Sequence, residues 1–311
     1  MRYTPFLVGG HDPLDHLALE NILLETLQAD QAFILFYINR PSVIIGRNQN
    51  PWREVAYDAT IPFYRRSSGG GAVYHDEGNL NWAFIIPRHG HDQDAELEAV
   101  ARGISSCGVE VAPGAHGGIY CTETTGYGGR KVSGTARRFD RASVLHHGTV
   151  LVKADMQCLH ECLGGIETQD DYSIASVSAS PVNLCDIHPG LTVQKVMKNL
   201  SYSITGKEPG VLPLGLVDNV RQKQERTRLA TNEWAYGLTP PFVVHVQTFS
   251  HLVTVRVRAG LVESTSVSRL PVTQGLKDIA SDRHIETNLV RLQAKPFSTR
   301  ILEEIRVLMH S

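Results

Sequence analysis

The chain has 311 residues, of which 42% are hydrophobic and 20% are charged, so it can bury a sizeable core and is long enough for two domains. Thirty Lys and Arg residues against 32 Asp and Glu residues give a formal net charge of −2, which argues against a general nucleic-acid-binding protein. No stretch approaches the ~18 consecutive apolar residues that a membrane-spanning helix needs.

The first predicted element is an amphipathic helix. Asp12 suits an N-cap and Pro13 suits the first helical position. The apolar residues that follow share one helical face: Leu14, Leu17, Ala18 and Leu24. A helix near the N-terminus is therefore expected.

Short strand-like runs dominate the next part of the chain. They lie at residues 33–38, 42–45, 72–74, 81–86 and 144–152. Few helical stretches separate them, so the sheet is expected to be mixed or antiparallel rather than doubly wound. Cys158 and Cys162 could suggest a metal pair, but without a second ligand pair we interpret them as part of a helix, and no metal ligand is assigned.

The C-terminal part predicts a separate small domain. A charged stretch at 221–228 is typical of a solvated helix, and the Thr-Pro-Pro at 239–241 marks a boundary. Beyond it we expect strands at 242–248, 252–257 and 261–267, and a helix capped by Ser298. The predicted domains are 1–240, catalytic, and 241–311, accessory.

The cysteine count indicates a reducing compartment. Five cysteines are an odd number without the spacing of a small disulfide scaffold. The N-terminal segment has no secretory apolar region and carries early acidic residues, unlike a transit peptide. We expect a cytoplasmic protein, although a mature mitochondrial form would have the same composition.

The densest signal is the segment RRSSGGGAVYHDEGN at residues 65–79. Three consecutive glycines expose backbone N–H groups and let a ligand approach, because no side chain stands in the way. Arg65 and Arg66 supply permanent charge for a phosphate or carboxylate. The spacing fits neither a Rossmann nor a P-loop motif. We expect an anion-binding loop, with a glycine-rich hairpin and solvated arginines as the alternative.

This segment resembles the signature of the lipoate–protein ligase A and lipoyltransferase family, in the biotin/lipoate attachment superfamily. Further blocks resemble the family's motifs in the same order: IGRNQNPW at 45–52, GRKVSGTA at 129–136, HHGT at 146–149, and NEW at 232–234 with Gly237 and 240–242. The C-terminal part matches only in general character. The sequence is identified as a member of this family.

The resemblance implies an α+β fold: a biotin/lipoate ligase-like catalytic domain with a mixed or antiparallel sheet and a small C-terminal α+β domain. It implies that lipoate and ATP, with Mg²⁺, form lipoyl-AMP, and that the lipoyl group passes to a carrier lysine. The implied carriers are lipoyl domains of 2-oxoacid dehydrogenase E2 subunits and the glycine cleavage H-protein. We expect a monomeric ligase that binds neither nucleic acid nor membrane.

The resemblance implies that Lys131 is the catalytic residue. A lysine suits this role because one compact ammonium can contact both the acyl carbonyl and the α-phosphate. By resemblance, the ATP and lipoyl-AMP site comprises Arg66, Ser68, Gly69, Gly70, Gly71, Ala72, Val73, Tyr74, His75, Asn79, Lys131, Ser133 and His147. Candidate walls for the apolar lipoyl chain are Val43, Ile45, Val73 and Leu145. Buried structural roles remain the alternative for His75 and His147.

Two departures from the family pattern keep other functions open. Residues 115–119 lack the carboxylate that usually precedes the lysine motif, and residues 176–184 lack the arginines frequent in ligases. The protein could therefore use only preformed lipoyl-AMP, or bind lipoate or its adenylate without catalysis. Cys121 raises the further alternative of an ATP-independent, Cys-dependent octanoyl or lipoyl transferase.

Overall fold

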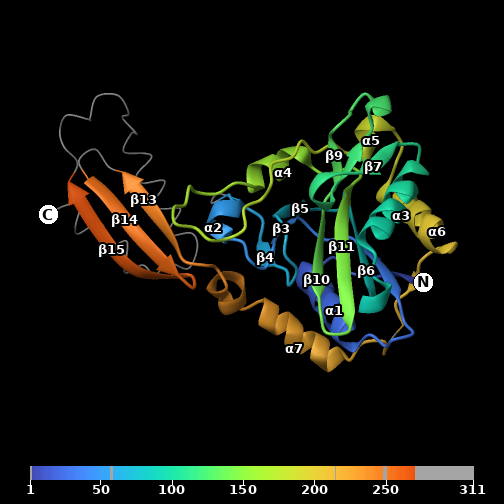
Figure 1. The fold of residues 1–311 in the computed structure, drawn as a ribbon, viewed down its shortest axis with the longest axis horizontal. Coiled ribbons are helices and arrows are strands. Elements are labelled where there is room, and N and C mark those ends of the chain that lie inside the picture. Colours follow the sequence, from blue (N-terminus) through green and yellow to red (C-terminus); the bar gives the residue numbers. More distant parts are fainter. Residues whose placement is uncertain (1, 57–58, 214, 248–250, 270–311) are drawn as a thin grey trace. The chain divides into compact units, whose positions relative to one another are not determined.

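The computed structural model describes residues 2–56, 59–213, 215–247 and 251–269 (Figure 1). The chain divides into two compact units. Unit 1 comprises Met1–Arg47, Ile61–His160 and Ser176–Ala230, and unit 2 comprises Asn48–Thr60, Glu161–Ala175 and the segment from Thr231. The domain boundary at 240/241 stays a prediction, and the helix predicted from Ser298 lies outside the described residues.

Unit 1 is built on a six-stranded mixed sheet in the order β10-β11-β6-β2-β1-β12. β1 runs parallel to β2 and β12, whereas β2–β6, β6–β11 and β11–β10 are antiparallel. The strands are β1 (Thr4–Leu7), β2 (Phe33–Tyr37), β6 (Asn79–Pro87), β10 (Thr135–Phe139), β11 (Ser143–Leu151) and β12 (Gly210–Val211). The predicted α+β fold with a mixed sheet is confirmed.

Each face of this sheet has its own apolar core because side chains alternate along a strand. On one face Trp82 and Phe84 pack with helices α3 (Gln93–Ser105) and α6 (Val193–Thr205). On the other face Leu35, Ile85 and Leu145 pack with α1 (Pro13–Thr26). Neighbouring residues of one strand therefore serve opposite faces.

The four longest helices of the described residues each begin at a residue whose side chain caps the first turn. The Asp12 carboxylate accepts from the N–H of Leu14 at 2.9 Å, which confirms the first predicted helix. Asp92 caps α3, a helix that the sequence analysis did not predict. Asp218 caps α7 (Asn219–Leu229), the predicted charged helix, which buries only Leu229. The remaining short helices are α2 (Pro51–Glu54), α4 (Met156–Cys162) and α5 (Leu184–Ile187).

Two small sheets complete unit 1. In the first, β3 (Ser42–Ile45) lies between parallel β4 (Phe63–Arg65) and antiparallel β5 (Val73–His75). In the second, β8 (Ile119–Cys121) lies between β7 (Val111–Pro113) and β9 (Lys131–Ser133). The glycine segment thus connects β4 to β5, and the lysine motif begins β9.

Unit 2 contains an antiparallel meander of β13 (Phe242–Gln247), β14 (His251–Arg258) and β15 (Leu261–Arg269). These strands confirm the three predicted after residue 241. Trp52, from a segment far earlier in the chain, packs against Phe242 with ring centroids 5.3 Å apart. Unit 2 therefore has a core of its own.

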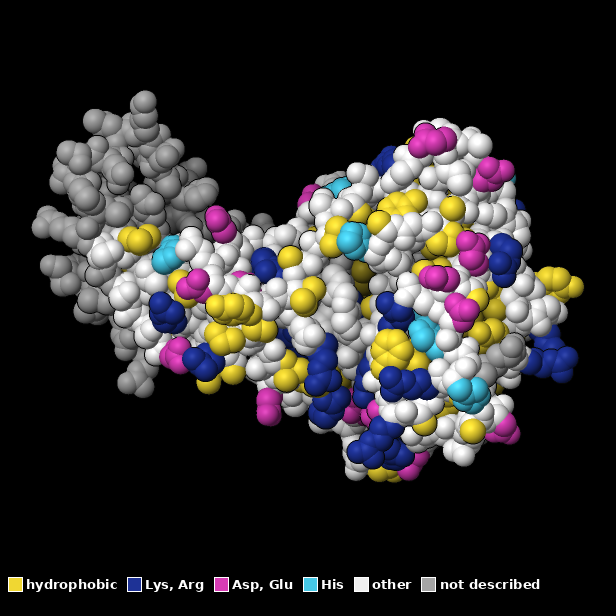
Figure 2. Space-filling model, in the orientation of Figure 1, with side chains coloured by type: hydrophobic (Ala, Val, Ile, Leu, Met, Phe, Trp, Pro, Cys, Tyr) yellow, Lys and Arg dark blue, Asp and Glu magenta, His cyan; other side chains and the backbone are white. Residues whose placement is uncertain are grey.

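The surface carries charges of both signs (Figure 2), as the nearly balanced numbers of basic and acidic residues indicate. On the face seen in Figure 2, Lys and Arg side chains lie in separate groups with Asp and Glu between them, rather than in one basic stripe. In the part of the chain that the structure describes, no helix combines the length and apolar character needed to cross a membrane.

Candidate functional site

The glycine segment and the lysine motif meet in unit 1. Gly70 has φ of +82°, and a Cβ placed on it would lie 3.3 Å from the Ala136 Cβ. A Cβ on Gly46 would collide with the carbonyl oxygen of Gly70. Glycine at these positions lets the loop pass between β3 and the start of β10. Residues predicted from separate motifs are thereby brought together.

Arg66 holds the glycine loop in shape. Its guanidinium is buried and donates to the carbonyl oxygens of Ile44 at 3.0 Å, Gly71 at 2.8 Å and Gly69 at 2.5 Å. It also donates to the hydroxyl of Ser68 at 3.0 Å. Burial lowers the pKa of Arg66 to about 10, which leaves it charged at neutral pH. A nucleotide contact by Arg66 stays a prediction; its observed partners are the loop and the carbonyl oxygen of Ile44 in β3.

Ser68 and His147, both predicted site residues, lie 2.7 Å apart through Oγ and Nε2. Nδ1 of the same imidazole lies 2.9 Å from the Glu20 carboxylate, which also accepts from the Tyr37 hydroxyl at 2.8 Å. Burial, followed by the nearby Glu20 charge, raises the pKa of Tyr37. The result is a chain of buried hydrogen bonds that holds Ser68, and with it the start of the loop, in place.

Glu20 and Tyr37 were not predicted from the sequence as site residues. A signal for Glu20 was available, because it lies three residues after Leu17 and four before Leu24, on the face assigned to the core. An acidic residue at such a position needs a buried partner. Here that partner is His147.

Lys131 lies half-buried in β9, and its Nζ is 5.8 Å from the centre of the Tyr120 ring. No carboxylate among the described residues pairs with this ammonium. Burial lowers the pKa of Lys131. An anionic ligand beside a half-buried ammonium would stabilise its charged form.

The segment at 176–184 runs beside Lys131. The backbone N–H of Lys131 donates to Ser180 O at 2.9 Å, and the N–H of Val182 donates to Lys131 O at 3.0 Å. At the start of this segment, the Ser176 hydroxyl accepts from the N–H of Ala72 at 2.8 Å. The segment at 176–184 therefore contacts both the lysine motif and the glycine segment.

Three predicted site residues carry buried polar atoms with no hydrogen-bond partner among the described residues: Nε2 of His75, Oδ1 of Asn79 and Oγ of Ser133. Burial, reinforced by the charge of Arg66, lowers the pKa of His75 to about 3, so it is neutral at physiological pH. Its Nδ1 lies 2.8 Å from the Asn39 amide. Unpaired buried atoms cost free energy, which a ligand or water atom can recover.

The other candidates are distributed around this centre. Gly69 has no neighbour within 4 Å of a Cβ, and Val73 is half-buried. Tyr74 is buried, and burial followed by a hydrogen bond from its hydroxyl to Cys158 raises its pKa. The other proposed walls for the lipoyl chain, Val43, Ile45 and Leu145, are fully buried.

Cys121 is surrounded by the apolar core on the α3 side of unit 1. It is 4% exposed and shares its cluster with Ile119 and Val132. Buried cysteines in apolar surroundings are typically inert, because the thiolate is disfavoured there. This position argues against a nucleophilic role.

Comparisons with known proteins give the family of the chain and relatives that share its fold. The model of the family described as lipoyl protein ligase A/B catalytic domain matches residues 12–205. P. falciparum LipL1, solved in complex with lipoate, is 21% identical, with TM-score 0.64 and 99% of each chain covered. A bi-partite lipoate protein ligase from Thermoplasma acidophilum, studied with its E2 lipoyl domain, is 22% identical, with TM-score 0.60, covering 76% of this chain and 98% of that one.

A lipoate-protein ligase A bound with ATP is 21% identical, with TM-score 0.58, covering 75% of this chain and 97% of that one. At these identities the solved structures show the shared fold. The matched range contains the whole glycine segment, Lys131 and His147. This chain belongs to the lipoyl protein ligase A/B catalytic domain family.

Proposed function

We propose that this chain is a lipoate–protein ligase that works through lipoyl-AMP. The lipoate carboxylate attacks the α-phosphorus of ATP and pyrophosphate leaves. The ε-amino group of a carrier lysine then attacks the acyl carbonyl, AMP leaves, and the amine loses a proton. The observation that carries this proposal is the half-buried Lys131 ammonium, which has no acidic partner among the described residues.

Lys131 would stabilise the charge that develops in both steps. Its single ammonium can contact a phosphate oxygen and the acyl oxygen together, and partial burial strengthens both contacts. The glycine loop would contribute backbone N–H groups for the same charge. The Ala72 N–H, which now donates to Ser176, would turn to a ligand oxygen. Arg66 would act by holding the loop open for the ligand.

Mg²⁺ would accompany the ATP phosphates rather than occupy an all-protein site. Mg²⁺ in nucleotide enzymes typically takes one or two protein oxygens and several waters or phosphate oxygens. Asn79 fits this need, because its Oδ1 is buried and has no hydrogen-bond partner in the part of the chain that the structure describes. The Asp76 carboxylate already accepts from the N–H groups of Gly78 and Asp155. Although residues 115–119 lack a carboxylate, Asn79 therefore remains a candidate ligand for Mg²⁺.

Arg130 offers a positive charge where the segment at 176–184 lacks arginines. Its guanidinium donates to Pro181 O at 2.5 Å and lies over the Tyr127 ring at 5.8 Å. It therefore stands beside the segment that pairs with Lys131. We propose that Arg130 supplies part of the charge that arginines of that segment provide in other ligases, so that ATP activation is retained.

The carriers would be lipoyl domains of 2-oxoacid dehydrogenase E2 subunits or the glycine cleavage H-protein. Support comes from the T. acidophilum relative, which was studied with its E2 lipoyl domain. Lipoate and ATP are the ligands named for two other relatives. The burial of Cys121 in an apolar cluster argues against a route through a cysteine thioester.

The lysine assignment is tested by comparing Lys131→Met with Lys153→Met, a substitution of an exposed lysine. Each folded variant receives lipoate, ATP, Mg²⁺ and an apo-carrier domain, and mass spectrometry follows lipoyl-AMP and the modified carrier. We expect Lys131→Met to slow carrier modification about 100-fold or more, while Lys153→Met stays at the wild-type rate. A folded Lys131→Met protein with the wild-type rate would overturn the assignment.

A further inference from the structure

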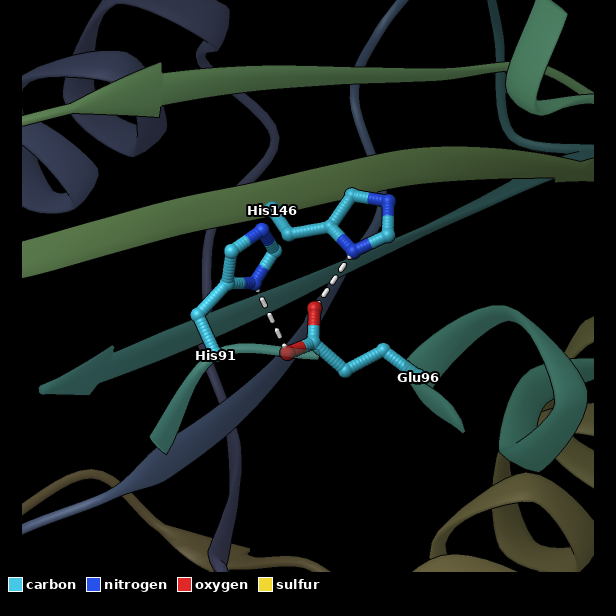
Figure 3. A group of neighbouring side chains, drawn as sticks. All are labelled: His91, Glu96 and His146. Atoms are coloured by element: carbon cyan, nitrogen blue, oxygen red, sulfur yellow. Dashed lines mark hydrogen bonds and ion pairs between the residues drawn. The ribbon is translucent and has the colours of Figure 1, made fainter. Parts of the chain in front are cut away.

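A second group of chemically active side chains lies on the sheet face opposite the glycine segment. His91, Glu96 and His146 come from the loop before α3, the first turn of α3 and the middle of β11 (Figure 3). Nδ1 of His146 lies 2.6 Å from one oxygen of Glu96, and Nδ1 of His91 lies 2.9 Å from the other. His146 directly precedes His147, so β11 serves both groups of residues.

The cluster is built around a buried carboxyl group that has no Lys or Arg partner among the described residues. The side chains of Glu96 and His146 are 2% and 0% exposed, and that of His91 is 11% exposed. Buried carboxylates are ordinarily paired with a charge or bound to a metal ion.

We propose that His91, Glu96 and His146 form a binding site for one divalent transition-metal ion, with Zn²⁺ as the fitting case. Two imidazole nitrogens and a carboxylate are donors that Zn²⁺ accepts, and a water completes four-coordination. One donor atom from each of the three side chains already lies within 4.8 Å of the other two. Each imidazole faces a different Glu96 oxygen, so the carboxylate can bind through one oxygen or both.

Metal bonds require a different spacing of the donor atoms from the hydrogen bonds. A tetrahedral ion with bonds of ~2.0–2.1 Å holds its donors about 3.3 Å apart. The two N···O contacts, at 2.6 and 2.9 Å, are shorter than this spacing, and the donor atoms all lie within 4.8 Å of one another. Coordination through Nδ1 requires the Nε2–H tautomer of each ring, and Nε2 of His146 is buried with no hydrogen-bond partner among the described residues. The alternative is that the two imidazole N–H groups alone satisfy the carboxylate, and it predicts no metal affinity.

The surroundings hold the donors in place. The backbone N–H of Asp92 donates to the Glu96 carboxylate at 3.0 Å, a supporting bond of the kind that orients metal ligands. The Trp82 ring packs edge-on against His146, and the Phe139 ring packs edge-on against His91. The ion would tie the start of α3 to β11. It would stabilise the strand that presents His147 without touching lipoate or ATP.

The test uses full-length, tag-free protein stripped of metals with a chelator. Zn²⁺ affinity is measured by competition with a chromogenic chelator, and Co²⁺ replaces Zn²⁺ to report coordination by its visible absorption. The variant is Glu96→Gln, which keeps the shape of the side chain but removes the charge. The matched control is His89→Gln, an exposed histidine of the neighbouring turn. Circular dichroism checks the fold of each protein.

We expect wild type and His89→Gln to bind one Zn²⁺ and to give the intense Co²⁺ bands of a four-coordinate site with nitrogen ligands. Glu96→Gln should bind Zn²⁺ about 100-fold more weakly or worse. If Glu96→Gln does not fold, the wild-type Co²⁺ spectrum still decides. Wild-type protein that gives only the spectrum of hydrated Co²⁺ and does not compete for Zn²⁺ would overturn the proposal, whatever its ligase activity.

Discussion

At the scale of residues, the two cations singled out from the sequence have different surroundings. The Arg66 guanidinium is bonded to carbonyl oxygens, one of them on Ile44 in the neighbouring strand. The Lys131 ammonium has no acidic partner among the described residues. The sequence predicted both as ligand contacts because charge and glycine spacing are readable. The sequence could not show that the Arg66 guanidinium donates to backbone carbonyl oxygens, because strand pairing decides which carbonyl oxygens lie beside it.

His75 makes stability depend on pH in a defined direction. Its pKa is about 3 in the folded chain and about 6.5 when unfolded. The unfolded state therefore binds the extra proton between these values, so the contribution to stability is complete above pH ~6.5 and is lost as the pH falls toward 3. At pH 5 we expect a loss of about 2 kcal/mol relative to pH 7 from this group.

Urea unfolding at pH 7 and pH 5 checks this value in wild type, His75→Gln and the exposed control His89→Gln. The control should keep the wild-type loss of stability between the two pH values, and His75→Gln should show a smaller one. Equal losses in all three proteins would mean that His75 is not held neutral by burial.

At the scale of elements, the glycine loop depends on close packing against β3. A Cβ on Gly46 would collide with the Gly70 carbonyl, whereas a Cβ on Gly69 would meet nothing within 4 Å. We expect Gly46→Ala to lower the free energy of unfolding by about 1–3 kcal/mol and Gly69→Ala to change it by less than about 0.5 kcal/mol. Urea midpoints of the two variants measure the difference. Similar midpoints would contradict the close approach.

Helix α7 is attached to α1 by polar contacts. Arg226 lies 3.1 Å from the Asp12 carboxylate and 2.8 Å from that of Asp15, and the Asn21 amide donates to Glu225 at 2.7 Å. Since the ion pairs are partly exposed, salt should weaken them. We expect amide exchange in α7 to rise about threefold between ~0.05 and ~0.5 M NaCl. The apolar-faced α3 is the internal control, and equal changes in both helices would contradict the account.

Elements with strong local signals could be predicted from the sequence. Asp12 and Pro13 marked α1, and the three strands after 241 were found because alternation and turn residues are local features. α3 was missed although Leu97, Val100 and Ile104 have helical spacing. The pairing of β2 with β6 could not be predicted, because it joins residues such as Phe36 and Trp82, far apart in sequence.

At the scale of the whole molecule, the chain forms two compact units, and each unit is made of segments that are separate in the sequence. Two early segments, Asn48–Thr60 and Glu161–Ala175, cluster with the part of the chain after Thr231. The Trp52–Phe242 ring contact shows why, since an aromatic core joins the first segment to β13. Composition cannot reveal such a grouping. Punctuation such as the Thr-Pro-Pro at 239–241 marks only where a chain turns.

The central claim is that the chain both activates lipoate and transfers it. The most direct measurement gives wild-type protein an apo-carrier domain in two tubes, one with lipoate, ATP and Mg²⁺ and one with synthetic lipoyl-AMP. Mass spectrometry then follows lipoyl-AMP and the carrier lysine. We predict a lipoylated carrier in both tubes and lipoyl-AMP in the ATP tube when the carrier is left out. Modification only from lipoyl-AMP would contradict the activation step, and an unmodified carrier in both tubes would contradict the claim as a whole.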